Sequence, residues 1–195
     1  ILIAASSGQG LLVRIARSAT VGHQQASCLG TSKHEALKAR PVPKGVDYDM
    51  WLGPAPFRPY HSIYHPANWR PWWDFGSGTV GDMGCHTFHV YFNELQLSAP
   101  AVVYARGSTR HEGFFQFVST PECQSHANVV SWEFPARGSL PPLQMHWYDG
   151  GMRPHRPAEF DLSLQLPASG LLFVGEKGKL VAGYSGGNPY GRRGL

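Results

Sequence analysis

The sequence predicts an α+β fold with a largely antiparallel, open-faced sheet that helices and aromatic-rich loops cover. Three observations favour it. Segments rich in β-branched and aromatic residues fill the second half of the chain, and turn residues separate them. One long helical pattern precedes most of these segments. The chain of 195 residues also contains 23 Gly and 16 Pro, which favours many turns over a helical bundle.

The N-terminal residues differ in character from the rest, and we expect a domain boundary there. Residues 1–19 predict a short apolar strand, a Gly-containing turn and a helix-like run that includes Leu11, Leu12 and Ile15. Gly8 and Gly10 suggest a dinucleotide loop only weakly, because Val13 occupies the third glycine position and no acidic residue follows at the expected distance. The predicted domains are a linker-like segment, 1–45, and a folded domain, 46–195.

The folded domain begins with an aromatic, proline-interrupted region over residues 46–78. A helix is expected from about Val80 to Leu97. After it the pattern predicts strands and a final hairpin with Glu-Lys-Gly at its turn; these segments cover residues 100–108, 127–134, 143–151 and 171–183.

Composition argues against several function classes. The formal charge is +4 and its basic residues are scattered, so no basic stripe predicts nucleic-acid binding. No apolar run reaches the roughly 18 residues of a membrane span. Cys28, Cys85 and Cys123 lie far apart without a CxxC pair, so neither a disulfide framework nor a zinc ribbon is expected. The pattern is compatible with a reducing compartment and slightly favours the cytoplasm.

The stretch "TVGDMGCHTFH" contains the most suggestive polar residues. Asp82 and His86 are four residues apart, so a helix places them on one face. Histidine titrates near neutrality and a carboxylate can orient its ring, which suits acid/base chemistry. The pair equally fits a helix cap and a core imidazole. His89 extends the face by three residues and opens a third interpretation, a metal site.

The preceding stretch "NWRPWWDFGSG" suggests carbohydrate binding. Indole faces stack on sugar rings, and Asn68, Arg70 and Asp74 can hydrogen-bond hydroxyl groups. The alternative is that these tryptophans pack a loop-rich core. A purely structural role is expected for Trp51, which lies in "DMWLG".

Four motifs in this order resemble one known family: "DYDMWLGPAPFRPY" at 47–60, "YHPANWRPWWDFGSGTVGDMGCH" at 64–86, "WYDGG" at 147–151 and "LFVGEKGKLVAGYSGGNP" at 172–189. From about Gly45 to its end the chain resembles the C-terminal half of the glucose–fructose oxidoreductase, inositol dehydrogenase and MocA-like (Gfo/Idh/MocA) family.

The resemblance implies the substrate-binding half of an NAD(P)-dependent oxidoreductase that acts on a sugar or polyol hydroxyl. His86 would take the hydroxyl proton while the adjacent carbon gives hydride to NAD or NADP, and Asp82 would orient the imidazole. The sheet would form the interface of a homo-oligomer. The residues expected to bind substrate are Trp69, Arg70, Trp72, Asp74 and His89.

The chain also departs from the family pattern. The N-terminal Rossmann half and the lysine of its Glu-Lys-Pro motif are not found, and Lys177 lies in a different context. Many relatives have Asp where this chain has His89. We therefore expect this fragment-like chain to be inactive by itself, with NAD or NADP bound mainly by the absent domain. Two alternatives remain: a non-catalytic truncated homologue that binds carbohydrate or oligomerises, and a metal-dependent hydrolase or lyase using Asp82, His86 and His89.

Overall fold

The computed structural model describes residues 11–17, 39–66, 68–112, 114–118, 121–158, 163, 166–175 and 178–183. These residues form two compact units. We call the first the sheet unit; its described residues fall within 11–17, 85–107 and 127–183. The second, the aromatic unit, comprises those within 39–84 and 108–126.

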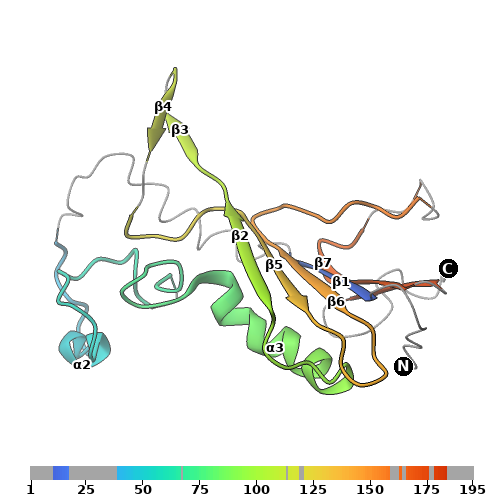
Figure 1. Ribbon diagram of the computed structural model, residues 1–195. Helices are drawn as coiled ribbons and strands as arrows, with labels where there is room; N and C mark the ends of the chain where they lie inside the picture. Colours follow the sequence, from blue (N-terminus) through green and yellow to red (C-terminus); the bar gives the residue numbers. More distant parts are fainter. Residues whose placement is uncertain are drawn as a thin grey trace. The chain divides into compact units, whose positions relative to one another are not determined.

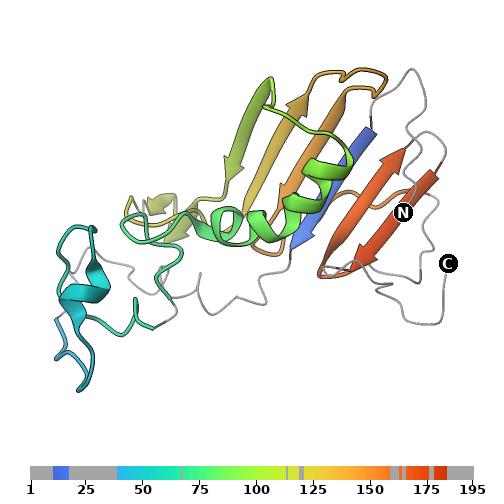
Figure 2. The same cartoon turned by 90° about the horizontal axis from the view of Figure 1, so that it is seen from below.

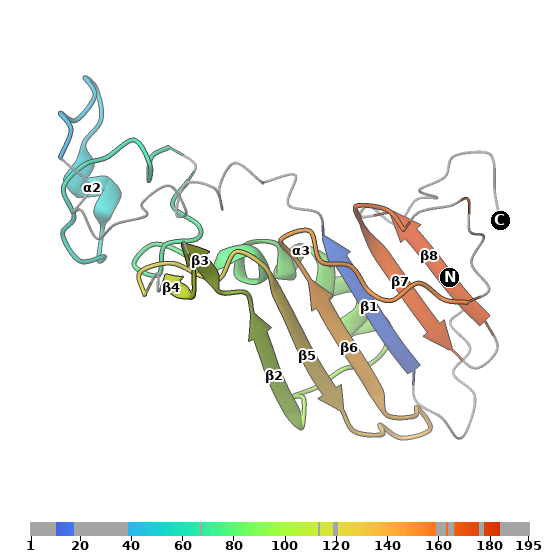
Figure 3. The ribbon, with the colours of Figure 1, turned by 90° about the horizontal axis from the view of Figure 1, so that it is seen from above.

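A six-stranded sheet forms the framework of the sheet unit (Figures 1 and 3). Its strand order is β2-β5-β6-β1-β7-β8, and every neighbouring pair is antiparallel except β1 and β6. The strands are β1 (Leu11–Arg17), β2 (Val102–Gly107), β5 (Asn128–Phe134), β6 (Leu143–Tyr148), β7 (Ser169–Gly175) and β8 (Gly178–Gly183).

The helix α3 spans Gly78–Glu94, and its part from Cys85 onward, which belongs to the sheet unit, covers one face of this sheet (Figure 2). The contact is aromatic: Phe88 meets Trp132 and Trp147 edge-on, with ring centroids 5.3 and 5.6 Å apart. Tyr91 meets Phe173 in the same manner at 5.4 Å. Along β6, Leu143, Met145 and Trp147 are buried while the intervening residues are more exposed. This alternation is what a strand with one covered face requires.

A buried carboxylate joins the end of β6 to the start of β5. Asp149 is 1% exposed and accepts hydrogen bonds from the Asn128 backbone N–H at 2.6 Å and the Trp147 Nε1–H at 3.1 Å. Gly150 and Gly151 follow with φ of 63° and 88°, a left-handed conformation that favours glycine. The "WYDGG" motif is therefore a strand end whose acid satisfies buried donors and whose glycines make the turn.

The aromatic unit contains little regular structure. The helix α2 (Tyr48–Leu52) is capped by Asp47, which accepts a hydrogen bond from the Met50 N–H at 3.0 Å, and ends at Gly53. A two-stranded hairpin, β3 (Arg110–Glu112) and β4 (Gln116–Val118), lies later in the chain. Two buried clusters form the core of this unit, with the members Tyr48, Leu52, Tyr60, Tyr64, Trp72 and Cys123. Trp51 and Phe75 pack against both clusters. Cys123 is disulfide-bonded, whereas Cys85, on α3, is an exposed cysteine outside any disulfide.

The expected α+β fold with a largely antiparallel open sheet is confirmed. The long helix and the later strands form within a few residues of their predicted bounds. The predicted hairpin also forms, although Glu176 and Lys177 at its turn lie outside the described residues.

One expectation was wrong. Residues 11–17 form the strand β1 and not the helix that the apolar spacing suggested. Short apolar runs fit either element, and pairing with β6 and β7 decides in favour of the strand. The N-terminal strand and turn expected before Leu11 lie outside the described residues. The domain boundary expected between residues 45 and 46 stays a prediction.

Replacing Asp149 with alanine should destabilise the protein by about 3 kcal/mol, because buried donors on Asn128 and Trp147 lose their acceptor. Urea denaturation of both proteins measures the difference. Glu94→Ala, which removes an exposed carboxylate, is the control and should change stability by less than about 0.5 kcal/mol. Equal effects of the two substitutions would contradict the role given to Asp149.

Candidate active site on helix α3 and the adjoining aromatic loop

Helix α3 presents the three polar residues that the sequence singled out. Asp82 is half-buried, whereas His86 and His89 are exposed. Asp82 and His86 are separated by one helical turn, so the predicted pair shares a face of the helix. Residues 78–84 of the helix belong to the aromatic unit and 85–94 to the sheet unit.

The loop before α3 is folded tightly onto itself. The Gly76 N–H donates to the Trp72 carbonyl at 2.7 Å, and the Gly78 N–H donates to the Arg70 carbonyl at 3.0 Å. A Cβ on Gly76 would lie 2.4 Å from the Arg70 carbonyl oxygen. Gly78 has φ of 69°, and a Cβ there would overlap the Gln124 side chain. The "FGSG" glycines are therefore required by close backbone approach and by a left-handed turn.

Arg70 links this loop to the start of α3. Its Nε lies 2.8 Å from Asp82 Oδ2, and its guanidinium lies over the Trp69 indole, 5.0 Å from the ring centroid. The second distance is within the range of a cation–π interaction. Asp82 therefore has a cationic partner within the aromatic unit, on the residue next to the tryptophan expected to contact sugar.

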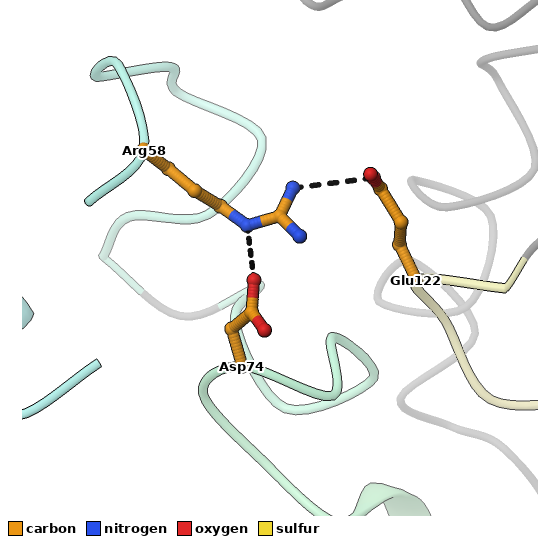
Figure 4. A network of polar contacts seen from close by, with 3 residues as sticks. All are labelled: Arg58, Asp74 and Glu122. Atoms are coloured by element: carbon orange, nitrogen blue, oxygen red, sulfur yellow. Dashed lines mark hydrogen bonds and ion pairs between the residues drawn. The ribbon is translucent and has the colours of Figure 1, made fainter. Parts of the chain in front are cut away.

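A second arginine holds the aromatic loop from another side. Arg58 Nε donates to Asp74 Oδ2, and its NH1 donates to Glu122 Oε2 at 3.2 Å (Figure 4). Its guanidinium also lies over Trp72, 5.7 Å from the ring centroid. Burial opposes the Arg58 charge, yet hydrogen bonds with Asp74, Tyr64 and Glu122 outweigh it, and its pKa is raised above the ordinary value. The cation therefore keeps its charge and ties residues 58, 74 and 122 together.

A groove lies beside this loop, wholly within the aromatic unit. Its volume is about 630 Å³, within the range of small-molecule sites. Trp73, 57% exposed, is its most open aromatic side chain. The lining consists of four aromatic residues, the short proline-containing segment after α2 and one carboxylate: Trp51, Leu52, Pro54, Ala55, Pro56, Trp69, Trp73, Asp74 and Phe75.

The residues expected to bind substrate lie in different surroundings. Trp69 and Asp74 line the groove, and Arg70 binds Asp82. Trp72 lies outside the lining: it is 2% exposed and packs edge-on against Tyr64. His89 is exposed on α3. The roles assigned to these side chains stay predictions.

Sequence reasoning missed three residues of this region, Arg58, Trp73 and Glu122. Arg58 and Glu122 are far apart in the sequence, and only folding shows that they meet. Trp73 was distinguishable from Trp72 only by its exposure. Trp51, expected to be structural, stacks on Tyr48 at 5.5 Å and also lines the groove.

Within the described ranges, no three His, Cys, Asp or Glu side chains come together in a way that could hold a metal ion. Asp82, His86 and His89 are all described, so α3 does not assemble the metal site that a hydrolase or lyase would need. Among the same residues, no helix combines the length and hydropathy needed to cross a bilayer.

Gly76→Ala should destabilise the protein by about 2 kcal/mol and alter the near-UV circular dichroism of its tryptophans, because the added methyl group displaces the Arg70 backbone. Urea denaturation and the near-UV spectrum measure both effects. Gly178→Ala is the matched control, since nothing lies within 4 Å of a Cβ there. An unchanged spectrum for Gly76→Ala would refute the close packing.

Comparison with protein families gives one match. The model described as the C-terminal alpha/beta domain of the oxidoreductase family Gfo/Idh/MocA matches residues 7–112. The match covers more than half of the chain and includes β1, the aromatic loop and α3. It begins well before Gly45, where the resemblance of motifs began. A comparison with curated proteins returns no match. The chain belongs to the Gfo/Idh/MocA oxidoreductase family, of which it contains the C-terminal α/β domain.

Proposed function

We propose that this chain is the substrate-binding half of an NAD(P)-dependent oxidoreductase that acts on a sugar or polyol hydroxyl. Family membership supports the reaction class. The observation that carries the proposal is the ion pair of Arg70 with Asp82, which attaches the aromatic loop to the helix bearing the Asp82–His86 pair. In this proposal Asp82 and His86 are catalytic, and Trp69, Arg70, Trp72, Asp74 and His89 contact or support the substrate.

His86 is the proposed base. Its imidazole is exposed on α3 and can accept the proton of a substrate hydroxyl as the neighbouring carbon is oxidised. Asp82 lies one helical turn earlier and is itself held by Arg70. We assign Asp82 the role of orienting the imidazole and stabilising its protonated form.

The residues beside the groove support the substrate side of this reaction and not the binding of a dinucleotide. Two arginines near the groove are engaged by carboxylates, Arg58 by Asp74 and Glu122, and Arg70 by Asp82. Neither is therefore available to pair with a pyrophosphate. NAD(P), when bound, supplies the hydride acceptor, and we propose that a nucleotide-binding domain of the full-length polypeptide holds it.

We further propose that the sheet mediates self-association. The edge strand β2 exposes Val102, Val103 and Tyr104, whereas a solitary edge would usually be blunted by charge. Light scattering of Val103→Lys against the unmodified protein tests this, and an unchanged mass would argue against β2 as the interface.

His86→Ala should lower kcat/KM about 10²- to 10⁴-fold in the full-length polypeptide, since the proton loses its acceptor. NAD(P)-dependent oxidation of a sugar and polyol panel gives the rates, from the absorbance of the reduced nicotinamide. His126→Ala removes another exposed histidine and should leave the rates unchanged. Wild-type rates in His86→Ala would refute the role assigned to His86. If the protein is instead a non-catalytic homologue, neither the wild type nor any variant would oxidise a sugar or polyol of the panel.

Asp82→Asn should lower kcat about tenfold or more with little change in KM, because an amide cannot compensate the imidazolium charge. The pH profile of kcat should shift as well, which loss of a merely structural contact would not cause. Arg70→Met, which removes the partner of Asp82, should reproduce part of the effect. A rise in KM with unchanged kcat would instead show that Asp82 only binds substrate.

A further inference from the structure

The groove of the aromatic unit is lined by more residues than the proposed reaction uses. Trp69 and Asp74 were expected to contact substrate, but Trp51, Pro54, Pro56 and Trp73 line the same cavity without a part in the proposed reaction. Its volume of about 630 Å³ leaves room for a ligand extending over this added surface.

The charge in the groove favours a neutral ligand. Asp74 is the one carboxylate of the lining, and it accepts a hydrogen bond from Arg58, a cation that Glu122 also engages. No Lys or Arg is among the described residues of the lining, so an anionic ligand has no cationic partner among them. Figure 4 shows one Asp74 oxygen directed at Arg58 and the other turned away from it. An aromatic site for an organic cation relies on negative charge and ring faces, whereas Asp74 is already paired with Arg58 and offers its remaining oxygen mainly as a hydrogen-bond acceptor.

The hydrogen-bonding character favours hydroxyl groups. An ionised carboxylate only accepts hydrogen bonds, so its ligand must donate them. Sugar hydroxyls do so while the C–H faces of the ring lie on indole surfaces such as Trp73. A proline-rich peptide also suits aromatic grooves, but its prolines have no N–H to offer Asp74.

The groove is connected to the proposed reaction site through one residue. Trp69 lines the groove and lies beneath the Arg70 guanidinium, and Arg70 pairs with Asp82. A ring held against Trp69 would therefore be one residue away from Arg70, the side chain that pairs with Asp82. All of these contacts lie within the aromatic unit.

We infer that the groove binds a second, neutral sugar ring attached to the ring that is oxidised, so that the substrate is a glycoside or short oligosaccharide. Trp73 and Trp69 provide stacking surfaces for this ring, and Asp74 accepts its hydroxyl hydrogen bonds. This inference rests on the proposed function and specifies its substrate class.

The test compares disaccharides with the free monosaccharides from which they are built. Maltose, cellobiose and lactose are assayed against glucose and galactose with the full-length polypeptide, and isothermal titration calorimetry measures binding of the same sugars without cofactor. We expect at least one disaccharide to exceed its monosaccharides at least tenfold in kcat/KM. Trp73→Ala should abolish this preference through a higher KM, and Trp73→Phe should restore part of it.

Phe114→Ala is the matched control, because Phe114 is an 88% exposed aromatic residue outside the groove. It should leave the disaccharide preference intact. Trp73 is itself exposed, so its truncation should not unfold the protein, and urea denaturation verifies this.

The outcomes separate the inference from the proposed function. Monosaccharide oxidation without any disaccharide preference would overturn the second-ring inference and leave the proposed function standing. Disaccharide binding that Trp73→Ala abolishes, without oxidation of any sugar, would support the groove and refute the oxidoreductase. Tighter binding of tetramethylammonium or of a polyproline peptide than of every sugar would overturn the inference, as would no binding at all.

Discussion

The aromatic unit depends on the charged contacts of Arg58. This side chain joins Asp74, on the loop before α3, to Glu122, which lies in a distant part of the sequence. The backbone supports the same junction, because the Trp73 N–H donates to the Glu122 carbonyl and the Gln124 N–H donates to the Pro71 carbonyl. The described residues of this unit contain the short helix α2, the first part of α3 and a small hairpin, so the unit obtains much of its order from these contacts and from its packed rings. Both the groove and the partner of Asp82 follow from this arrangement.

Much of the fold was predictable because its signals are local. Alternating apolar residues predicted β5, β6 and the β7–β8 hairpin, and the regular helical pattern predicted α3. The strand β1 was not predictable, since its strand conformation is decided by pairing with residues more than a hundred positions away. The Asp149 contacts likewise require β5 and β6 to be neighbours, so "WYDGG" indicated a turn but not a buried carboxylate.

The sequence indicated which helix and which loop carry the candidate residues, but not the contacts that these residues make. The sequence placed Asp82 and His86 on one helix, and the family match agrees with the reaction class that the motifs suggested. It did not show that Arg70 pairs with Asp82, because an ion pair depends on how the loop turns back at Gly76 and Gly78. The sequence likewise did not show that Trp72 is buried whereas the adjacent Trp73 is exposed.

The contrast between Trp72 and Trp73 has a consequence for how ligand preference can change. Trp72, Gly76 and Arg58 set the course of the loop, so substitutions there would disturb the fold. Trp73 shares that backbone but extends into the groove with much of its surface exposed. A substitution at position 73 would therefore change the shape of the groove while the packed residues of the loop keep their contacts. The packed residues fix the loop, whereas Trp73 can be replaced, so directed evolution of new specificities would begin at position 73.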